Sequence, residues 1–266
     1  MAIAFENASS APQASALAPH RLVPLAVPEA AARAGVRLLR VDCAFGTPLD
    51  VPAHAALDAA ERARAARFLR AEDATRSAAT RAALREVLGA ALGVAPAALR
   101  FVTGEAGRPA LVPDCAPGAA SLDFNVSHSG GHALIAWSAS TRVGVDVEAP
   151  REGFDWTPLG QSVFAPADEA AVLACAPAER RDAFYRVWTA KEALLKVLGV
   201  GIAGGLEAFS VLDPQRPGEL VPCVVDPAAP ASGVAAYTAA WVDAAPGHPA
   251  CLAWRPLAGE QGEQGE

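Results

Sequence analysis

The chain has 266 residues, of which 52% are hydrophobic, and it carries a formal net charge of −7 at pH 7. This length accommodates one large domain or two domains of about 100–150 residues each. The negative charge disfavours non-specific binding to nucleic acid, and no apolar run reaches the roughly 18–20 residues of a membrane-spanning helix. The five cysteines are scattered and form no C-x-x-C pair, so a disulfide framework or a zinc site is not expected. This pattern favours a protein of the reducing cytoplasm.

The first half of the chain is predicted to combine strands with helices rich in alanine and arginine. Helical patterning covers residues 57–92 with a break near Glu72–Asp73, so a second helix is expected over 75–88, closed by Gly89. Period-2 apolar patterns predict strands, at residues 37–42, 99–103, 110–112, 124–129 and 132–138.

The second half repeats this mixture of elements. Helices are expected over 166–175 and over 178–198, the latter closed by Gly199, and strands are expected at 142–148, 235–242 and 250–255. Helices plus antiparallel strands in each half predict the α+β class. We expect two similar, pseudo-duplicated subdomains between a flexible leader and a polar tail, with bounds at 1–20, 21–139, 140–257 and 258–266.

Asp146 and Glu148 lie at the end of a predicted strand. Alternation along a strand points both carboxylates to one face and Val147 to the core. Two carboxylates held side by side repel each other, and Mg²⁺ typically takes one or two carboxylates together with waters and substrate phosphates. The pair therefore indicates a possible magnesium site, although a D-x-E motif alone is more often an exposed pair of acids.

Lysine occurs only at Lys191 and Lys196, whereas the other 20 of the 22 cationic residues are arginines. The ammonium of lysine is a compact point charge that can reach one phosphate oxygen. The planar guanidinium of arginine cannot replace it at such a place. Both lysines lie on the predicted helix that carries Glu192, a candidate third carboxylate. An ordinary Glu192–Lys196 pair one turn apart is the alternative interpretation.

Two further groups suit a phosphate ligand. Ser127 and His128 follow a strand and could hold a phosphate; a serine hydrolase is disfavoured because the chain has no G-x-S-x-G elbow. Seven arginines between residues 62 and 85 could serve a small polyanion or form a solvated helix face.

Three blocks together resemble the signature blocks of the surfactin-type 4′-phosphopantetheinyl transferases. They are Phe-Asn-Val-Ser-His-Ser-Gly at 124–130, Val-Gly-Val-Asp-Val-Glu at 143–148, and Phe-Tyr-Arg-Val-Trp-Thr-Ala-Lys-Glu-Ala-Leu-Leu-Lys at 184–196. Their order and separations are similar to those of the family. Upstream, Gly107-Arg108-Pro109 resembles the family's Gly-Lys-Pro turn, and residues 67–76 resemble its basic helix.

The resemblance implies transfer of the phosphopantetheine arm of coenzyme A, the substrate, to a serine of an acyl or peptidyl carrier protein, with release of 3′,5′-ADP. It implies Mg²⁺ held by Asp146, Glu148 and Glu192. The implied coenzyme A contacts are Ser127, His128, Lys191 and Lys196 for the phosphates, and Arg64, Arg76 and Arg108 for the 3′-phosphate and adenine end. Glu192 and Lys196 are the implied catalytic residues.

Some properties stay open at this point. The proton of the serine could pass to Glu192 or to a water; Asp168, beside Glu169, stands near the family's middle-helix acid and is not assigned as the base. A Mg²⁺-dependent nuclease is disfavoured because Pro150 stands where such sites place a lysine, and a non-catalytic carrier-protein binder is disfavoured because the acids and lysines are retained. We expect a monomer without nucleic-acid or membrane partners. An alanine- and leucine-rich surface after Gly153 is one candidate docking face for an acidic carrier helix.

Overall fold

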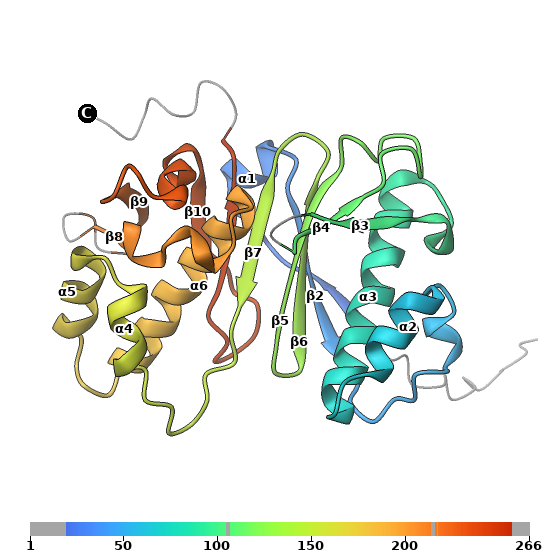
Figure 1. The fold of residues 1–266 in the computed structure, drawn as a ribbon, viewed down its shortest axis with the longest axis horizontal. Coiled ribbons are helices and arrows are strands. Elements are labelled where there is room, and N and C mark those ends of the chain that lie inside the picture. The colour runs from blue at the N-terminus through green and yellow to red at the C-terminus, as the bar shows by residue number, and fades with distance from the viewer. Residues whose placement is uncertain (1–19, 105–106, 214–215, 217, 257–266) are drawn as a thin grey trace, which may run out of the picture.

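The structure is a computed structural model that describes residues 20–256 except 105–106, 214–215 and 217. It has two halves side by side, each with an antiparallel sheet and packed helices (Figure 1), which confirms the predicted α+β class and its paired arrangement. The tail and all but the last residue of the leader lie outside the described residues, as does part of the hairpin turn after Gly104. No helix in the described part of the chain is both long and apolar enough to cross a bilayer.

The first half is built on a four-stranded sheet. Its order is β1 (His20–Pro24), β2 (Arg37–Cys43), β6 (His132–Ser138) and β5 (Asp123–Ser129), all antiparallel. The helices are α1 (Glu29–Arg33), α2 (Ala59–Ala66) and α3 (Ala71–Leu92), with 3₁₀ turns at Pro52–His54 and Pro96–Ala98 and a hairpin of β3 (Phe101–Thr103) and β4 (Pro109–Leu111). Apolar side chains of α3, including Leu84 and Leu88, pack with Phe124 and Ile135 of the sheet.

The second half is built on the sheet β10 (Thr238–Trp241), β11 (Ala250–Trp254) and β7 (Val143–Val147). Its other elements are α4 (Thr157–Val163), α5 (Pro166–Ala174), α6 (Arg180–Leu198), the hairpin β8 (Phe209–Leu212) and β9 (Leu220–Val224), and 3₁₀ turns at Ile202–Gly204, Leu206–Ala208 and Pro230–Ala236. Helix α6 lies directly on β7 because Gly144 has no side chain: a Cβ there would stand 2.2 Å from the Ala193 carbonyl oxygen. This close packing fixes the height of α6 over the strand.

The helix break in the first half was predicted at the wrong place. The interruption lies at residues 67–70, and α3 continues through Gly89 to end at Gly93, whose φ of 68° is the left-handed conformation that favours glycine. Gly89 serves a different purpose, since a Cβ there would stand 2.9 Å from the Val94 carbonyl oxygen. The returning chain, and not the helix end, requires that glycine.

The two halves are joined by hydrogen bonds in which side chains of β5, in place of backbone carbonyl groups, accept from backbone amides of the second half. Strands β5 and β7 run in the same direction, and every second side chain of β5 accepts a hydrogen bond from an amide of β7 or the residue after Glu148. The bonds run from Val143 N to Asp123 Oδ2 (2.8 Å), Val145 N to Asn125 Oδ1 (2.9 Å), Val147 N to Ser127 Oγ (3.4 Å) and Ala149 N to Ser129 Oγ (3.0 Å). A shared core that includes Leu134, Val145 and Val147 covers the junction. The ends of β5 and β7 are therefore held in register.

Candidate active site

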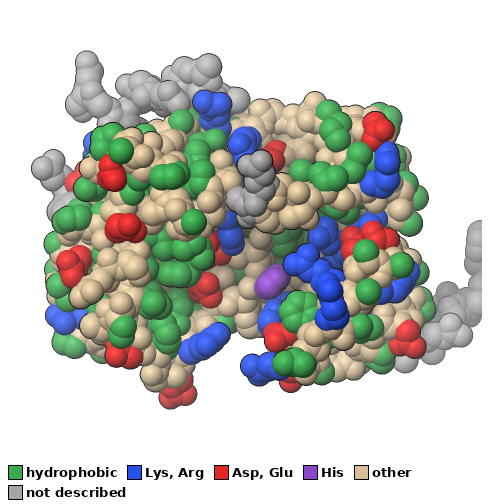
Figure 2. Space-filling model, in the orientation of Figure 1, with side chains coloured by type: hydrophobic (Ala, Val, Ile, Leu, Met, Phe, Trp, Pro, Cys, Tyr) green, Lys and Arg blue, Asp and Glu red, His purple; other side chains and the backbone are tan. Residues whose placement is uncertain are grey.

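The candidate site lies where the ends of β5 and β7 meet the middle of α6. Figure 2 shows a hollow between the two halves, with a histidine near its centre and basic side chains gathered along the side of the first half. The first half contributes Ser127, His128 and Ser129, and the second contributes the acids of β7 and α6. Because the β5–β7 ladder sets their register, residues far apart in sequence face one another here.

Asp146 is buried at the base of the hollow, with 3% of its surface exposed. Its Oδ1 accepts hydrogen bonds from Lys196 Nζ (2.6 Å) and Ser127 Oγ (2.7 Å), whereas its buried Oδ2 has no partner among the described residues. Lys196 Nζ also donates to Ser127 Oγ at 3.1 Å. One oxygen of the carboxylate is thus fixed by protein donors and the other is left open.

Glu148 has a donor on each of its carboxylate oxygens. The indole N–H of Trp188 donates to Oε1 (3.2 Å), and Ser129 Oγ donates to Oε2 (3.0 Å). Burial raises the pKa of Glu148 above its ordinary value, and the negative charge of Asp146 raises it further. The two acids of β7 therefore sense each other, as their predicted common face requires.

Glu192 completes the acidic group from α6. Its side chain is 8% exposed, and its buried Oε1 has no hydrogen-bond partner in the described structure. Burial raises the pKa of Glu192 to about 7; the charge of Lys196 opposes this shift, and those of Asp146 and Glu148 add to it. The carboxyl group is half-protonated near neutral pH.

The donor set of this group suits a hard divalent cation. Within the described residues, no set of three or more His, Cys, Asp or Glu side chains is already arranged as a metal cage. Mg²⁺, however, takes only one or two carboxylates and completes its shell with waters and substrate phosphates. Such a cation would provide a ligand contact for the unpartnered oxygens Asp146 Oδ2 and Glu192 Oε1. It would also offset the charges of Asp146 and Glu148, which add to the raised pKa of Glu192.

A pocket of about 440 Å³ adjoins His128 on the side of the first half, and Arg64, Arg67, Arg81 and Phe101 are among its lining residues. Partial desolvation lowers the pKa of His128, and the charges of Arg76 and Lys196 lower it further, so the ring is neutral at pH 7. Arg64, which the family resemblance implies as a contact of the 3′-phosphate and adenine end, is one of these lining residues. A neutral imidazole beside several guanidinium groups is suited to a phosphate-bearing ligand.

Arg76 lies beside this pocket but is partly engaged by the protein. It forms an ion pair with Asp73 and donates to the Gly130 carbonyl oxygen at 2.8 Å. Ser127 is likewise engaged, since its hydroxyl donates to Asp146 and accepts from Val147 N and Lys196. We therefore place Ser127 behind Asp146, as a support for that carboxylate, and correct the expectation that it lines the phosphate site.

The prediction that Lys191 contacts a phosphate is wrong. Its side chain is fully buried on the opposite side of α6, where Nζ donates to the carbonyl oxygens of Val163, Leu206 and Phe209 and lies 2.7 Å from Asp168 Oδ2. Asp168 also accepts from the amides of the β8 residues Val211 and Leu212. This pair ties α5 and α6 to β8, and Asp168 is therefore not the general base.

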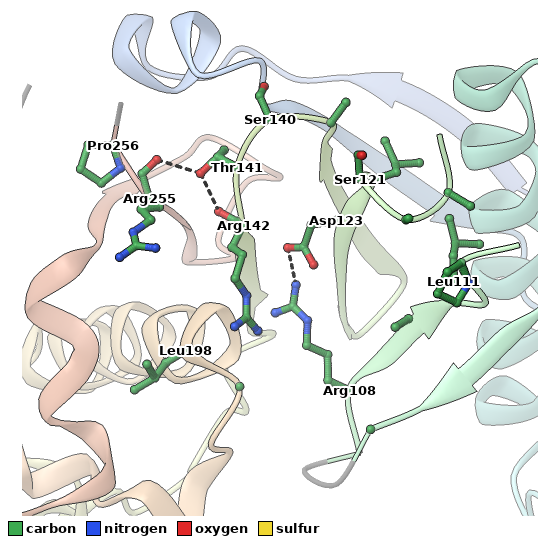
Figure 3. A pocket seen from close by; sticks show the side chains of 18 residues that line it. Arg108, Leu111, Ser121, Asp123, Ser140, Thr141, Arg142, Leu198, Arg255 and Pro256 are labelled. Atoms are coloured by element: carbon green, nitrogen blue, oxygen red, sulfur yellow. Dashed lines mark hydrogen bonds and ion pairs between the residues drawn. The ribbon is translucent and has the colours of Figure 1, made fainter. Parts of the chain in front are cut away.

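The structure also contradicts the assignment of Arg108 to the 3′-phosphate end. Its guanidinium donates to Asp123 Oδ2 (2.7 Å), Phe124 O (2.9 Å), Val143 O (2.8 Å) and the carbonyl of Lys196. Figure 3 shows Arg108 facing Asp123 in a separate cavity of about 960 Å³, at the end of the β5–β7 junction away from the acids. Arg108 clamps the two halves together.

Sequence reasoning missed the partners of Glu148. Ser129 lies two residues after Ser127 on the same strand face, which is a signal that strand alternation offered. No local pattern indicates that the indole N–H of Trp188 reaches Glu148 at the end of β7. Arg67, Arg81 and Phe101 in the basic pocket were also not selected, because their convergence depends on the packing of α2, α3 and β3.

Comparison with known protein families covers most of both halves. Residues 51–140 match the family described as 4′-phosphopantetheinyl transferase, N-terminal, and residues 142–236 match the 4′-phosphopantetheinyl transferase superfamily. The two matched segments adjoin between β6 and β7. Each contributes one wall of the site.

Individual relatives give the same picture. The 4′-phosphopantetheinyl transferase HetI of Nostoc is 36% identical over 179 residues, which are 65% of this chain and 75% of HetI. A putative 4′-phosphopantetheinyl transferase of Synechocystis is 37% identical over 62% of this chain and 65% of its own length. The 4′-phosphopantetheinyl transferase Sfp of Bacillus subtilis is 30% identical over 57% of this chain and 64% of its own length. For the last two, the match spans less than two thirds of the relative.

Proposed function

The chain belongs to the 4′-phosphopantetheinyl transferase superfamily, and from this membership we propose that it transfers the phosphopantetheine arm of coenzyme A to a serine of an acyl or peptidyl carrier protein. The products are the modified carrier and 3′,5′-ADP, and the reaction depends on Mg²⁺. The site geometry supports this proposal most directly through one observation: Lys196 contacts Asp146 and acts electrostatically on Glu148 and Glu192, beside a pocket lined by arginines.

The pocket supports the binding of the nucleotide end of coenzyme A. Arg64 lines it and makes no side-chain hydrogen bond or ion pair within the described residues, and the neutral His128 ring can donate one hydrogen bond to a phosphate oxygen. Lys196 already lies 2.6 Å from Asp146 Oδ1, and it can turn part of its hydrogen-bonding capacity to the pyrophosphate. Phosphoryl transfer needs mostly this kind of positioning and charge neutralisation from a protein.

The open oxygens of Asp146 and Glu192, with Glu148, would hold Mg²⁺. When bound, the cation supplies charge neutralisation for the pyrophosphate of coenzyme A. In the transfer, the serine oxygen of the carrier forms a bond to the phosphorus that carries the pantetheine arm, and the bond from that phosphorus to 3′,5′-ADP breaks. The serine proton passes to Glu192 directly or to a water beside it.

The test is an assay for released 3′,5′-ADP with coenzyme A, Mg²⁺ and a panel of unmodified acyl and peptidyl carrier domains, with the mass of the carrier measured in parallel. A stoichiometric gain of the arm on the carrier serine, lost in EDTA, is the expected result. Binding of carrier without release of 3′,5′-ADP would instead indicate a non-catalytic binder. A monomeric state and a cytoplasmic location stay predictions.

A further inference from the structure

The connection between α2 and α3 exposes two adjacent apolar side chains. Leu69 is fully exposed, at 102% of its reference surface, and Phe68 is 44% exposed. Single exposed apolar residues are ordinary on protein surfaces, whereas adjacent exposed apolar residues form a patch that is available for contact with a partner. Neither belongs to a buried core cluster of the described structure.

The connection is also basic in a chain of net charge −7. Residues 62–71 contain four arginines and no acid. Arg62 is held by the carbonyl oxygens of His54 and Ala55, but Arg64, Arg67 and Arg70 make no side-chain hydrogen bond or ion pair within the described residues. The charges of Arg67 and Arg70 are available to a carrier, whereas Arg64 belongs to the coenzyme A pocket described above, and we call Arg67, Phe68, Leu69 and Arg70 the α2–α3 patch.

The patch is held in place at both ends. At the end of α2 the amides of Arg67 and Phe68 donate to the carbonyl oxygens of Arg64 (3.2 Å) and Ala65 (3.3 Å), and at the start of α3 the carbonyl oxygen of Arg70 accepts from Ala74 N (3.1 Å). A short connection between two fixed helices presents its side chains in a defined place at little entropic cost. Two of its members, Arg67 and Phe68, line the pocket that contains Arg64 and His128, so the patch borders the candidate site.

We infer that the α2–α3 patch is the docking surface for the carrier protein and that it binds an acidic segment of the carrier with an apolar face. This inference rests on the proposed function. The leucine and phenylalanine supply the apolar anchor of the contact, and the arginines select and steer a partner of opposite charge. The patch lies in the first half, unlike the surface after Gly153 that the sequence offered.

The experiment uses the full chain and the carrier domain that the wild-type protein modifies fastest in the panel. Leu69→Ser and Arg70→Glu are compared with a matched control, Leu173→Ser, because Leu173 on α5 is also exposed, at 48%, but lies in the other half after Gly153. Carrier affinity is measured by calorimetry without coenzyme A, coenzyme A affinity is measured separately, and transfer kinetics give kcat and KM for the carrier.

We expect Leu69→Ser to weaken carrier binding by about tenfold and to raise KM for the carrier with little change in kcat. Arg70→Glu should weaken binding and reduce its salt dependence, and reversing an acidic residue of the carrier to lysine should restore part of the loss. Leu173→Ser should bind and react as the wild type does. Coenzyme A affinity should be unchanged in all three variants.

Two results overturn the inference about the patch, and a third overturns the proposed function as well. Wild-type carrier affinity in both Leu69→Ser and Arg70→Glu removes the patch from the interface. A loss confined to Leu173→Ser places docking in the second half. If the wild-type protein modifies and binds no carrier in the panel, the proposed function fails and the inference fails with it, whereas a wild-type protein that works leaves only the patch in question.

Discussion

Replacing Arg108 with alanine separates the clamp seen in the structure from the phosphate contact predicted from the sequence. The guanidinium bridges β4, β5, β7 and the end of α6 through Asp123, two strand carbonyls and the carbonyl of Lys196. The side chains of Arg108 and Asp123 are 14% and 28% exposed, so the pair is neither on the surface nor fully dry. Among the described residues, removing the arginine leaves Asp123 with the Val143 amide as its one remaining donor.

The expected cost follows from that setting. Breaking a buried ion pair from one side costs about 3–5 kcal/mol, and exposed pairs contribute about 0–1 kcal/mol. For this partly buried group, with its carbonyl contacts, we expect Arg108→Ala to lower the free energy of unfolding by about 2–4 kcal/mol. In a protein of this size each kcal/mol lowers Tm by about 2–4 °C, so the Tm should fall by about 4–16 °C.

The assay is urea unfolding followed by circular dichroism, with thermal scans in parallel and calorimetry for coenzyme A and dephospho-coenzyme A. Arg64→Ala is the matched control, because Arg64 was predicted for the same ligand but is exposed and lines the basic pocket. It should retain wild-type stability and bind coenzyme A about tenfold or more weakly, with a smaller effect on dephospho-coenzyme A. The reasoning is refuted if Arg108→Ala is as stable as the wild type and selectively loses affinity for coenzyme A.

Three further outcomes are expected. Lys196→Arg should lower turnover by about a hundredfold at unchanged fold stability, because the wider guanidinium cannot keep its place beside Asp146; near-normal transfer would show that any cation suffices. In EDTA, the free energy of unfolding should fall by about 2–3 kcal/mol as pH rises from about 4.5 to 7, because the folded protein keeps a Glu192 proton that the unfolded chain releases. Urea titrations of Glu192→Gln should show a flatter dependence of this free energy on pH. Equal slopes for the variant and the wild type would contradict the raised pKa. Trp188→Phe removes the donor to Glu148 and should weaken Mg²⁺ binding by calorimetry about tenfold; unchanged affinity would leave the indole a packing role only.

Local periodicity was sufficient to locate the acids. Strand alternation pairs Asp146 with Glu148, and helix geometry places Lys196 close to the direction of Glu192, since four residues come round to within about 40°. The same geometry separates Lys191 from Lys196 by about 140°, so the two lysines could not share one face. Which of them faced the site depended on where α6 packs, and Gly144 and the buried Asp168 decided that.

The sequence by itself determined the α+β class, the family blocks and the residue types of the site, because these are carried by short-range patterns. Only the tertiary structure decided which polar groups are free. Arg108 and Arg64 are the same side chain to any local pattern. Yet Arg108 donates to Asp123 and three carbonyl oxygens, whereas Arg64 makes no side-chain hydrogen bond within the described part of the chain. A hydrogen-bond donor is available to a ligand only when distant parts of the chain leave it unsatisfied, and that balance is set by packing across the junction of the two halves.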